Sequence, residues 1–408
     1  MTDAPQPRAL SIYIVAAEES GDALGAALIR ALRARHGGTL TIAGVGGRAM
    51  AAAGVASPFA IEDLSIIGLN AIPRRLPTIF RRIGETADAV IAKRPDALVI
   101  IDSPDFTHRV ARRVRRQVPS IPILDYVSPS VWAWRSGRAR AMRVYVDEVL
   151  AILPFEPAAH AKLGGPPCVY VGHPLIERIG ELRPNAAEAQ RRRSSPPIVL
   201  LLPGSRLTEI RRLMGNFGAA IARVADRAGP LEVVLPTVPH LASFVRDASA
   251  GWTAKPRIVV EPPEKWAAFR CARAALAASG TVTLELALAG VPTVAGYRGS
   301  IIEAFIARLV GIQSKLPSVI LGNLALGENA IPEFIQEECT PGLLANALVP
   351  LLSDTPQRRR QIEAFQRLDA IMGMGGEAPS AKAADIVLGF AQRGRRVPAA
   401  AATPLGPR

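Results

Sequence analysis

The sequence predicts an α/β protein with two Rossmann-like, doubly wound domains that face each other across a cleft. Short apolar runs alternate with amphipathic helical segments along the 408 residues, a pattern typical of parallel sheets with helices on both faces. In each half, a polar turn that contains glycine follows a buried run, at 17–22 and at 203–206. Ligands bind such sheets at the carboxyl ends of the strands, so we expect these turns to line the cleft.

The apolar runs predict the strands, and the segments between them predict the helices. In the first half we expect strands at 10–16, 39–43, 97–101, 121–127, 149–153 and 168–171. In the second half we expect strands at 198–202, 231–235, 257–260, 274–277 and 291–295. Amphipathic spacing predicts helices at 23–35, at 207–225 and over much of 343–392. A further helix is expected to have Pro77 in its first turn.

Changes in composition predict the domain boundaries. We expect a first domain at 1–182 and a linker at 183–197, because the linker stretch combines prolines, serines and charges. The second domain then covers 198–360. We expect helices at 361–392, and the chain can cross back to the first domain there. Residues 393–408, rich in Pro, Ala and Arg, are expected to form a disordered tail.

The net charge of +14 suggests an anionic partner: nucleic acid, a membrane surface or a phosphorylated small molecule. An arginine-rich genome composition explains many of the same arginines. Aromatic residues make up only 5%, and no zinc-finger or RNA-binding pattern occurs, so we expect no nucleic acid partner. The three cysteines and five histidines are dispersed, so we expect neither a metal nor another cofactor. We expect no signal peptide, because residues 1–8 are followed by a predicted strand and not by a cleavage site. No apolar run in this sequence reaches the roughly 18 residues of a membrane span.

The segment Pro203–Arg206 combines a strand end, a glycine turn and a helix start. Backbone N–H groups and the helix dipole converge at such a start and suit a phosphate. Gly204 and Ser205 would shape this turn, and Arg206 would add a positive charge. An ordinary turn with Ser205 as helix N-cap explains the same residues, and the local pattern leaves both interpretations open.

A second helix start, rich in hydroxyl groups, follows the run at 274–277. Ser279, Gly280 and Thr281 offer donors there, and two such starts in one domain suit a nucleotide diphosphate. Glu285 is placed to accept hydrogen bonds from a ribose diol, and a plain helical glutamate explains that position equally well.

Asp102 ends the run at 97–101 and is our first candidate for a general base that activates an acceptor hydroxyl. Glu18, Glu19 and Asp105 compete for this role. Because Asp-Ser-Pro is also favourable turn chemistry, a purely local role for Asp102 stays open.

A set of short motifs occurs in order between residues 11 and 392. They are Val15-Ala-Ala-Glu-Glu-Ser-Gly-Asp22, Ile101-Asp-Ser-Pro-Asp-Phe106, Tyr126-Val-Ser-Pro-Ser-Val-Trp-Ala-Trp-Arg135, Leu153-Pro-Phe-Glu156, Leu202-Pro-Gly-Ser-Arg206, Ala278-Ser-Gly-Thr281 with Glu285, Gly296-Tyr-Arg298, Asn323 and Gln336-Glu-Glu-Cys339. Together, they resemble the lipid-A-disaccharide synthase family of inverting glycosyltransferases with two Rossmann-like domains (GT-B type).

The resemblance implies a reaction. UDP-2,3-diacylglucosamine would donate its sugar to the 6-hydroxyl of 2,3-diacylglucosamine 1-phosphate (lipid X), which releases UDP and forms a β-1,6 disaccharide in lipid A biosynthesis. The resemblance also implies that Asp102 and Arg206 are the catalytic positions and that the second domain holds the nucleotide.

The residues expected at the ligands follow from the same motifs. For UDP they are Gly204, Ser205, Arg206, Ser279, Gly280, Thr281, Glu285 and Asn323. For the acceptor side they are Glu18, Ser20 and Gly21. The chain departs from the family pattern at Ala17, Ala71 and Asn329, which concerns the acceptor side and the 323–329 loop.

Lipid substrates would explain why the segment at 66–82 is apolar and basic at once. Exposed apolar residues beside arginines suit acyl chains and anionic headgroups. We expect these contacts from Ile66, Ile67, Leu69, Arg74 and Arg75. This predicts a cytoplasmic enzyme bound peripherally to the inner membrane. The apolar stretch at 301–312 suits a second such face, a dimer contact or a core helix, and the resemblance allows a homodimer.

Two alternatives remain at this point. Another UDP-sugar lipid glycosyltransferase or a UDP-sugar epimerase would use the same scaffold and differ in its product. A basic protein that binds nucleic acid or membrane would account for the charge alone, and it predicts salt-sensitive binding without any response to UDP.

Overall fold

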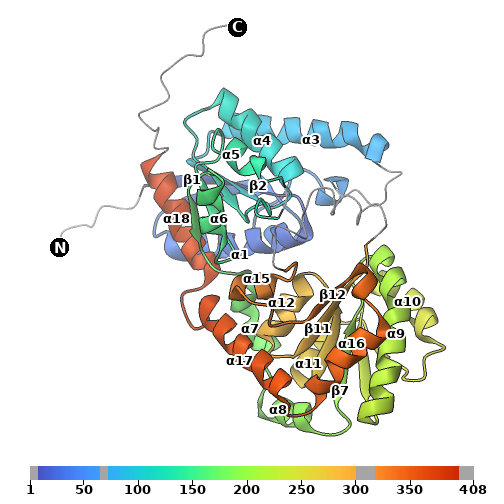
Figure 1. Cartoon of the computed structure of the whole chain (residues 1–408). Helices are drawn as coiled ribbons and strands as arrows, with labels where there is room; N and C mark the ends of the chain where they lie inside the picture. Colours follow the sequence, from blue (N-terminus) through green and yellow to red (C-terminus); the bar gives the residue numbers. More distant parts are fainter. Residues whose placement is uncertain (1–7, 65–71, 134, 300–317, 395–408) are drawn as a thin grey trace. The chain divides into compact units, whose positions relative to one another are not determined.

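The computed structural model describes residues 8–64, 72–133, 135–299 and 318–394, without the side chains of 72–75. The chain forms two compact units (Figure 1). The first unit joins Met1–Pro174 to Gly376–Arg408, and the second comprises Leu175–Gly375. Each unit has its own sheet and its own apolar core, which confirms the prediction of two Rossmann-like domains.

The first unit is built on a six-stranded sheet whose neighbouring strands all run parallel. In chain order these are β1 (Leu10–Ala16), β2 (Leu40–Val45), β3 (Ala97–Ile101), β4 (Ile123–Tyr126), β5 (Glu148–Ala151) and β6 (Cys168–Tyr170). Across the sheet the order is β2-β1-β3-β4-β5-β6. The winding therefore reverses between β1 and β3, and doubly wound sheets bind ligands at the carboxyl ends beside such a switch point.

Helices cover both faces of this sheet. They are α1 (Glu19–Arg35), α2 (Arg48–Ala52), the 3₁₀ turn η1 (Ile61–Leu64), α3 (Ile72–Lys93), α4 (Pro104–Gln117), α5 (Gly137–Met142), α6 (Glu156–Lys162) and α18 (Pro379–Arg393). Successive strand residues face opposite sides, so Val15 packs with α3 and α4 whereas Ile14 packs with α1 and α18. Helix α18, red in Figure 1, thus returns to the first unit.

The second unit has a parallel six-stranded sheet of its own. Its strands are β7 (Ile198–Leu202), β8 (Glu232–Pro236), β9 (Arg257–Val259), β10 (Ala274–Ala278), β11 (Thr293–Tyr297) and β12 (Glu333–Ile335). The order β12-β11-β10-β7-β8-β9 is that of a Rossmann sheet read from its far edge. Its switch point lies between β7 and β10.

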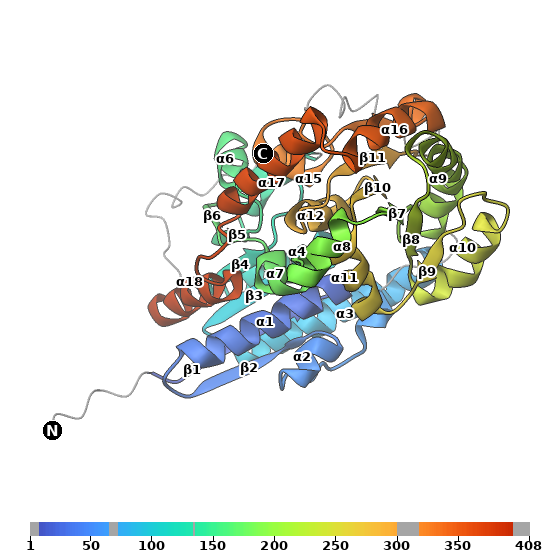
Figure 2. The ribbon, with the colours of Figure 1, turned by 90° about the horizontal axis from the view of Figure 1, so that it is seen from below.

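The helices of the second unit form two layers. They are α7 (Ile179–Leu182), α8 (Ala186–Arg193), α9 (Leu207–Ala228), α10 (Ala242–Ser249), α11 (Pro262–Cys271), α12 (Thr281–Leu288), α15 (Leu321–Leu326), α16 (Pro341–Leu348) and α17 (Pro356–Ile371). Short 3₁₀ turns are η3 (Pro174–Arg178), η4 (Pro239–Leu241), η5 (Gln336–Glu338) and η6 (Val349–Leu352). Figure 2 shows α9 and α16 on one side of the sheet and α11 and α12 on the other.

The division into units differs from the predicted domain boundary. The chain enters the second unit after Pro174, and residues 183–197 belong to that unit instead of forming a linker. They contain α8, which Asn185 caps by accepting a hydrogen bond from Glu188 N at 2.9 Å. Arg192 binds α8 to the unit by donating to four backbone carbonyls near the ends of α11 and α12. Prolines and serines at 194–197 therefore follow a packed helix.

Three other elements differ from expectation. Pro77 lies inside α3, because that helix begins five residues earlier, at Ile72. Strand β12 was not predicted, since three residues are too few to show a period. The helices expected at 361–392 divide between the units, with α17 in the second and α18 in the first. Residues 301–312 and all but the first two residues of the 393–408 tail lie outside the described residues.

Candidate functional site

Asp102 directly follows β3, at the switch point of the first sheet. Ala16 pairs with Ile101, so β1 and β3 end side by side. Asp102 and Ser103 both have left-handed φ angles, of 49° and 45°. This conformation costs roughly 1–2 kcal/mol for a residue other than glycine, and strain of this kind clusters at functional sites.

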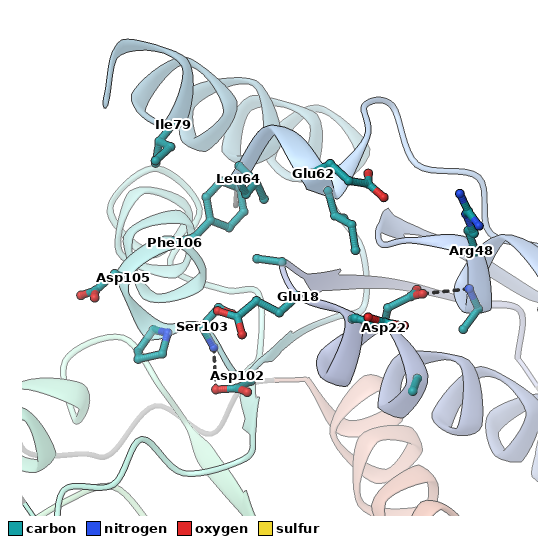
Figure 3. A pocket seen from close by; sticks show the side chains of 16 residues that line it. Glu18, Asp22, Arg48, Glu62, Leu64, Ile79, Asp102, Ser103, Asp105 and Phe106 are labelled. Atoms are coloured by element: carbon teal, nitrogen blue, oxygen red, sulfur yellow. Dashed lines mark hydrogen bonds between the residues drawn. The ribbon is translucent and has the colours of Figure 1, made fainter. Parts of the chain in front are cut away.

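A pocket of about 1050 Å³ opens at these strand ends. Figure 3 shows the carboxylates of Glu18 and Asp102 near one another, with Phe106, Leu64 and Ile79 on the apolar side. A pocket with an acidic end and an apolar wall suits an amphipathic ligand that carries a hydroxyl group.

Burial raises the pKa of the Asp102 carboxyl group above its ordinary value. The backbone N–H of Ser103 opposes this rise by donating to Oδ1 at 2.7 Å, and the negative charge of Glu18 adds to it. In the described part of the chain Oδ2 receives no hydrogen bond, so it remains available to a ligand. A carboxylate with a raised pKa is the stronger base, which suits proton abstraction from a hydroxyl.

The other residues of this motif have different surroundings. Ser20 is exposed, Gly21 is buried at the start of α1, and neither lines the pocket. Asp22 is buried, and its carboxylate accepts three backbone N–H bonds at the start of α2, at 2.7 to 3.0 Å. Figure 3 shows Asp22 pointing toward that helix.

We expect Asp22→Ala to destabilise the first unit by about 3 kcal/mol, because buried donors left without an acceptor cost about 1–3 kcal/mol each. Urea denaturation measures this loss. Asp105→Ala removes an exposed carboxylate of α4 and serves as the control, with little change expected. Equal stability of Asp22→Ala and the wild type would contradict the capping role.

The first unit also contains a buried polar network that the sequence did not reveal. Asp125 of β4 has no exposed surface, and its Oδ2 lies 3.1 Å from His108 Nε2. His108 Nδ1 lies 3.0 Å from the hydroxyl oxygen of Tyr145, to which Arg112 Nη2 donates at 3.3 Å. The available signal was an aspartate within an otherwise apolar strand, because a buried carboxylate needs partners.

Two of the family-like motifs meet at a second buried acid. Trp132 Nε1 and the backbone N of Leu153 donate to Glu156 at 3.3 and 3.0 Å. Burial raises the pKa of Glu156 to about 7. These hydrogen-bond partners of Glu156 are residues of the first unit. Packing within this unit therefore accounts for part of the 126–135 and 153–156 motifs.

In the second unit, the predicted phosphate turn lies at the switch point. Leu202 pairs with Ala277, so β7 and β10 end side by side. The turn after β7 and the helix start after β10 are therefore neighbours, as a shared nucleotide site requires. The φ angle of Gly204 is 118°, and a Cβ there would lie 2.5 Å from Glu209 Oε2. This turn accordingly requires glycine.

In this structure, the backbone N–H groups of the turn donate to a carboxylate of the protein, that of Glu209. Glu209 Oε2 accepts from the backbone N of Ser205 and of Arg206, at 3.3 and 3.4 Å. Arg206, rather than Ser205, is the N-cap of α9, and its guanidinium lies 3.0 Å from Glu209 Oε1 with 80% of the side chain exposed. An ion pair with so exposed a partner contributes about 0–1 kcal/mol, so the pair itself only weakly opposes the replacement of Glu209 by a phosphate.

The second helix start combines exposed residues with engaged ones. Gly280 is the N-cap of α12, and it and Thr281 are exposed, whereas Ser279 N donates to the Gly296 carbonyl at 3.1 Å. Glu285, one turn further, is half-buried and lies 3.1 Å from Lys265 Nζ. A ribose at Glu285 would therefore share this carboxylate with the lysine.

Asn323 has an internal role in this structure. It is 1% exposed, and its Nδ2 donates to Ser318 Oγ and the Ile331 carbonyl at 3.2 and 2.9 Å. Its Oδ1 accepts from Ile331 N at 2.9 Å. These bonds hold the loop that contains Asn329, and the role of Asn323 toward UDP stays a prediction.

The predicted membrane contacts fall outside the description: Ile66, Ile67 and Leu69 entirely, and Arg74 and Arg75 in their side chains. Two other apolar residues of α3, Leu76 and Phe80, are 41% and 54% exposed. No helix within the described ranges is long and apolar enough to cross a membrane. Among the same residues, no group of three or more His, Cys, Asp or Glu side chains could hold a metal ion.

Comparison with known proteins gives matches of three kinds: a family model, a relative of similar sequence and two solved structures. A family model described as lipid-A-disaccharide synthetase matches residues 12–386. The lipid-A-disaccharide synthase of Bradyrhizobium diazoefficiens is 59% identical over 385 residues, which cover 94% of this chain and 97% of that protein. Among solved structures, a putative UDP-N-acetylglucosamine 2-epimerase from Listeria monocytogenes has a TM-score of 0.61 at 11% identity, covering 93% of this chain and 95% of that one. A calicheamicin glycosyltransferase has a TM-score of 0.56 at 17% identity, with coverages of 95% and 99%. The solved structures share the fold alone.

Proposed function

The chain belongs to the lipid-A-disaccharide synthetase family, and on that premise we propose the substrates and residue roles of its reaction. It is a glycosyltransferase of lipid A biosynthesis. Its donor is UDP-2,3-diacylglucosamine, its acceptor is 2,3-diacylglucosamine 1-phosphate, and its products are the β-1,6 disaccharide 1-phosphate and UDP. The observation that carries the residue roles is that Asp102 and the 203–206 turn each lie at the switch point of their own sheet.

Asp102 acts as the general base in this proposal. As the 6-hydroxyl oxygen of the acceptor attacks the anomeric carbon of the donor, Oδ2 accepts the hydroxyl proton. The bond from the anomeric carbon to the UDP oxygen breaks on the opposite face, which inverts the configuration. The raised pKa of Asp102 supports this role, because a carboxylate whose pKa lies above the ordinary value is a stronger base.

The second unit stabilises the leaving group. The backbone N–H groups of Ser205 and Arg206 bind the diphosphate in place of Glu209, and the Arg206 guanidinium neutralises the charge that develops on UDP. The start of α12, at Gly280 and Thr281, adds a second set of donors next to the first.

Lipid substrates place the enzyme at the anionic cytoplasmic face of the inner membrane. The exposed Leu76 and Phe80 of α3 and the net charge of +14 support this placement, since each Lys or Arg near an anionic surface contributes about 1 kcal/mol. Assembly as a homodimer stays a prediction from the family resemblance.

The purified protein should release UDP and form the disaccharide from both diacylated substrates in detergent without added metal, as measured by mass spectrometry. UDP should also raise the Tm more than CDP or GDP at equal concentration, because only a ligand of the folded state stabilises it. An epimerase would alter the donor sugar without joining two sugars. Folded protein with that activity and no disaccharide product would contradict the proposal.

A further inference from the structure

A second pocket of the first unit, of about 450 Å³, is lined mainly by arginines. Arg109, Arg112 and Arg116 come from α4, and Arg138 comes from α5. The three residues of α4 follow one another at helical spacing, which places them on one face. We call these four residues the arginine pocket. Asp105 is the only acidic residue among the described residues that line it.

The positive charge of this pocket is poorly neutralised. Arg138 lies 3.6 Å from Asp105, which is 84% exposed. In the described structure, the three lining arginines of α4 form no ion pair with an acidic side chain, whereas Arg113 on the same helix pairs with Asp88 at 2.9 Å. Positive charges gathered in one concave site favour the binding of an anion.

Arg112 is held in place before any ligand arrives. Its guanidinium lies 4.7 Å from the centre of the Tyr145 ring and donates to the Tyr145 hydroxyl. That hydroxyl lies beside His108, which in turn contacts the buried Asp125. An arginine restrained in this way loses little conformational entropy on binding, and its planar donors match the oxygens of a phosphate.

The arginine pocket adjoins the pocket of Asp102, because Pro104 and Asp105 line both. Arg109 lies five residues along α4 from Pro104, about 8 Å at 1.5 Å per residue. Long side chains on a helix lean toward its N-terminus. Accordingly, Arg116 Nε donates to the Arg112 carbonyl one turn closer to the N-terminus of α4, and the Arg109 guanidinium lies 5.2 Å from the centre of the Phe80 ring of α3.

We propose that the arginine pocket binds the phosphate monoester of the acceptor while its 6-hydroxyl lies at Asp102. This inference rests on the proposed function and adds the residues that select a phosphorylated acceptor. In a hexose 1-phosphate, the carbons that carry the phosphate and the hydroxymethyl group flank the ring oxygen. The two groups are thus close enough for adjoining pockets. A phosphate monoester carries nearly two negative charges at neutral pH.

The test compares acceptor kinetics of Arg109→Ala and Arg112→Ala with those of Arg113→Ala, the matched control on the same helix. Loss of a hydrogen bond between charged groups should raise the KM for the phosphorylated acceptor about 10- to 100-fold in the two pocket variants. In the control Arg113→Ala, the KM for the phosphorylated acceptor should equal that of the wild type. The KM for the donor should stay unchanged in all three variants. With 2,3-diacylglucosamine, which lacks the phosphate, the wild-type KM should already be high, and the variants should not raise it further.

Three outcomes would overturn the inference. The first is a wild-type KM for the phosphorylated acceptor in both pocket variants. The second is an equal loss with both acceptors, since that indicates a structural role. The third is weaker binding to phosphatidylglycerol–phosphatidylcholine vesicles with unchanged KM values in detergent, which would assign the pocket to a lipid headgroup. Direct titration of the phosphorylated acceptor in detergent gives the same comparison without turnover, so failure of the proposed function is distinguishable from failure of this site.

Discussion

Asp102→Asn should fold normally and lose most of its turnover. We expect kcat to fall by about 10²–10⁴, because an amide cannot accept the proton of the acceptor hydroxyl. Asn tolerates the left-handed φ of this position, and its side-chain oxygen can still accept the bond from Ser103 N, so the Tm should change little. UDP release under saturating substrates measures kcat, and a value near that of the wild type would remove Asp102 as the base.

The pH dependence gives the same assignment an independent check. The reaction needs the deprotonated carboxylate, so kcat/KM should fall as the pH drops through the pKa of Asp102, at higher pH than for an ordinary carboxyl group. Glu18→Gln is the matched variant in the same pocket. Because the charge of Glu18 raises the pKa of Asp102, this variant should move the acidic limb to lower pH. An acidic limb that stays in place in Glu18→Gln would contradict the coupling of these carboxylates.

Arg206→Ala should lower kcat by about 10²–10³, the usual effect of removing one group that stabilises developing negative charge. The Tm should hardly change, because the side chain is 80% exposed and its ion pair with Glu209 is of the weak surface type. Steady-state kinetics and thermal denaturation measure the two effects separately.

Arg227→Ala is the control for this prediction, since Arg227 lies near the other end of α9 and bonds to Asn346. It should keep the wild-type kcat. If Arg206→Ala raised only the KM for the donor and left kcat intact, Arg206 would act in ground-state binding and not on the leaving group.

Local sequence patterns predicted those features that depend on residues next to one another in the chain, such as strand bounds and tight turns. Strand β7 has the predicted bounds, since five apolar residues end at a proline. The turn at Gly204 could be predicted from sequence, because glycine is the residue that most readily adopts the positive φ that tight turns need. Ser205 as the N-cap was one of two open interpretations, and the structure instead has Arg206 at the N-cap, because the side chain that satisfies these donors comes from Glu209 in the helix itself.

Contacts between distant parts of the chain account for what local patterns did not predict. Asp125 and His108 are far apart in sequence and become partners only when β4 lies beside β3 and α4. Asn323 is one of the positions that resemble the family, and its side-chain amide donates hydrogen bonds to Ser318 and to the Ile331 carbonyl. The boundary at Pro174 depends on how α8 packs, which composition does not show.

The sequence by itself determined the fold class, the turns at the strand ends, and Asp102 and Arg206 as candidates, because periodicity and turn chemistry act between near neighbours. Only the tertiary structure decided the strand orders, which bring β1 beside β3 and β7 beside β10 and so make those turns into sites. It also decided that arginines from α4 and α5 share one pocket next to Asp102. The physical reason is that strand order and pocket lining depend on packing between segments far apart along the chain.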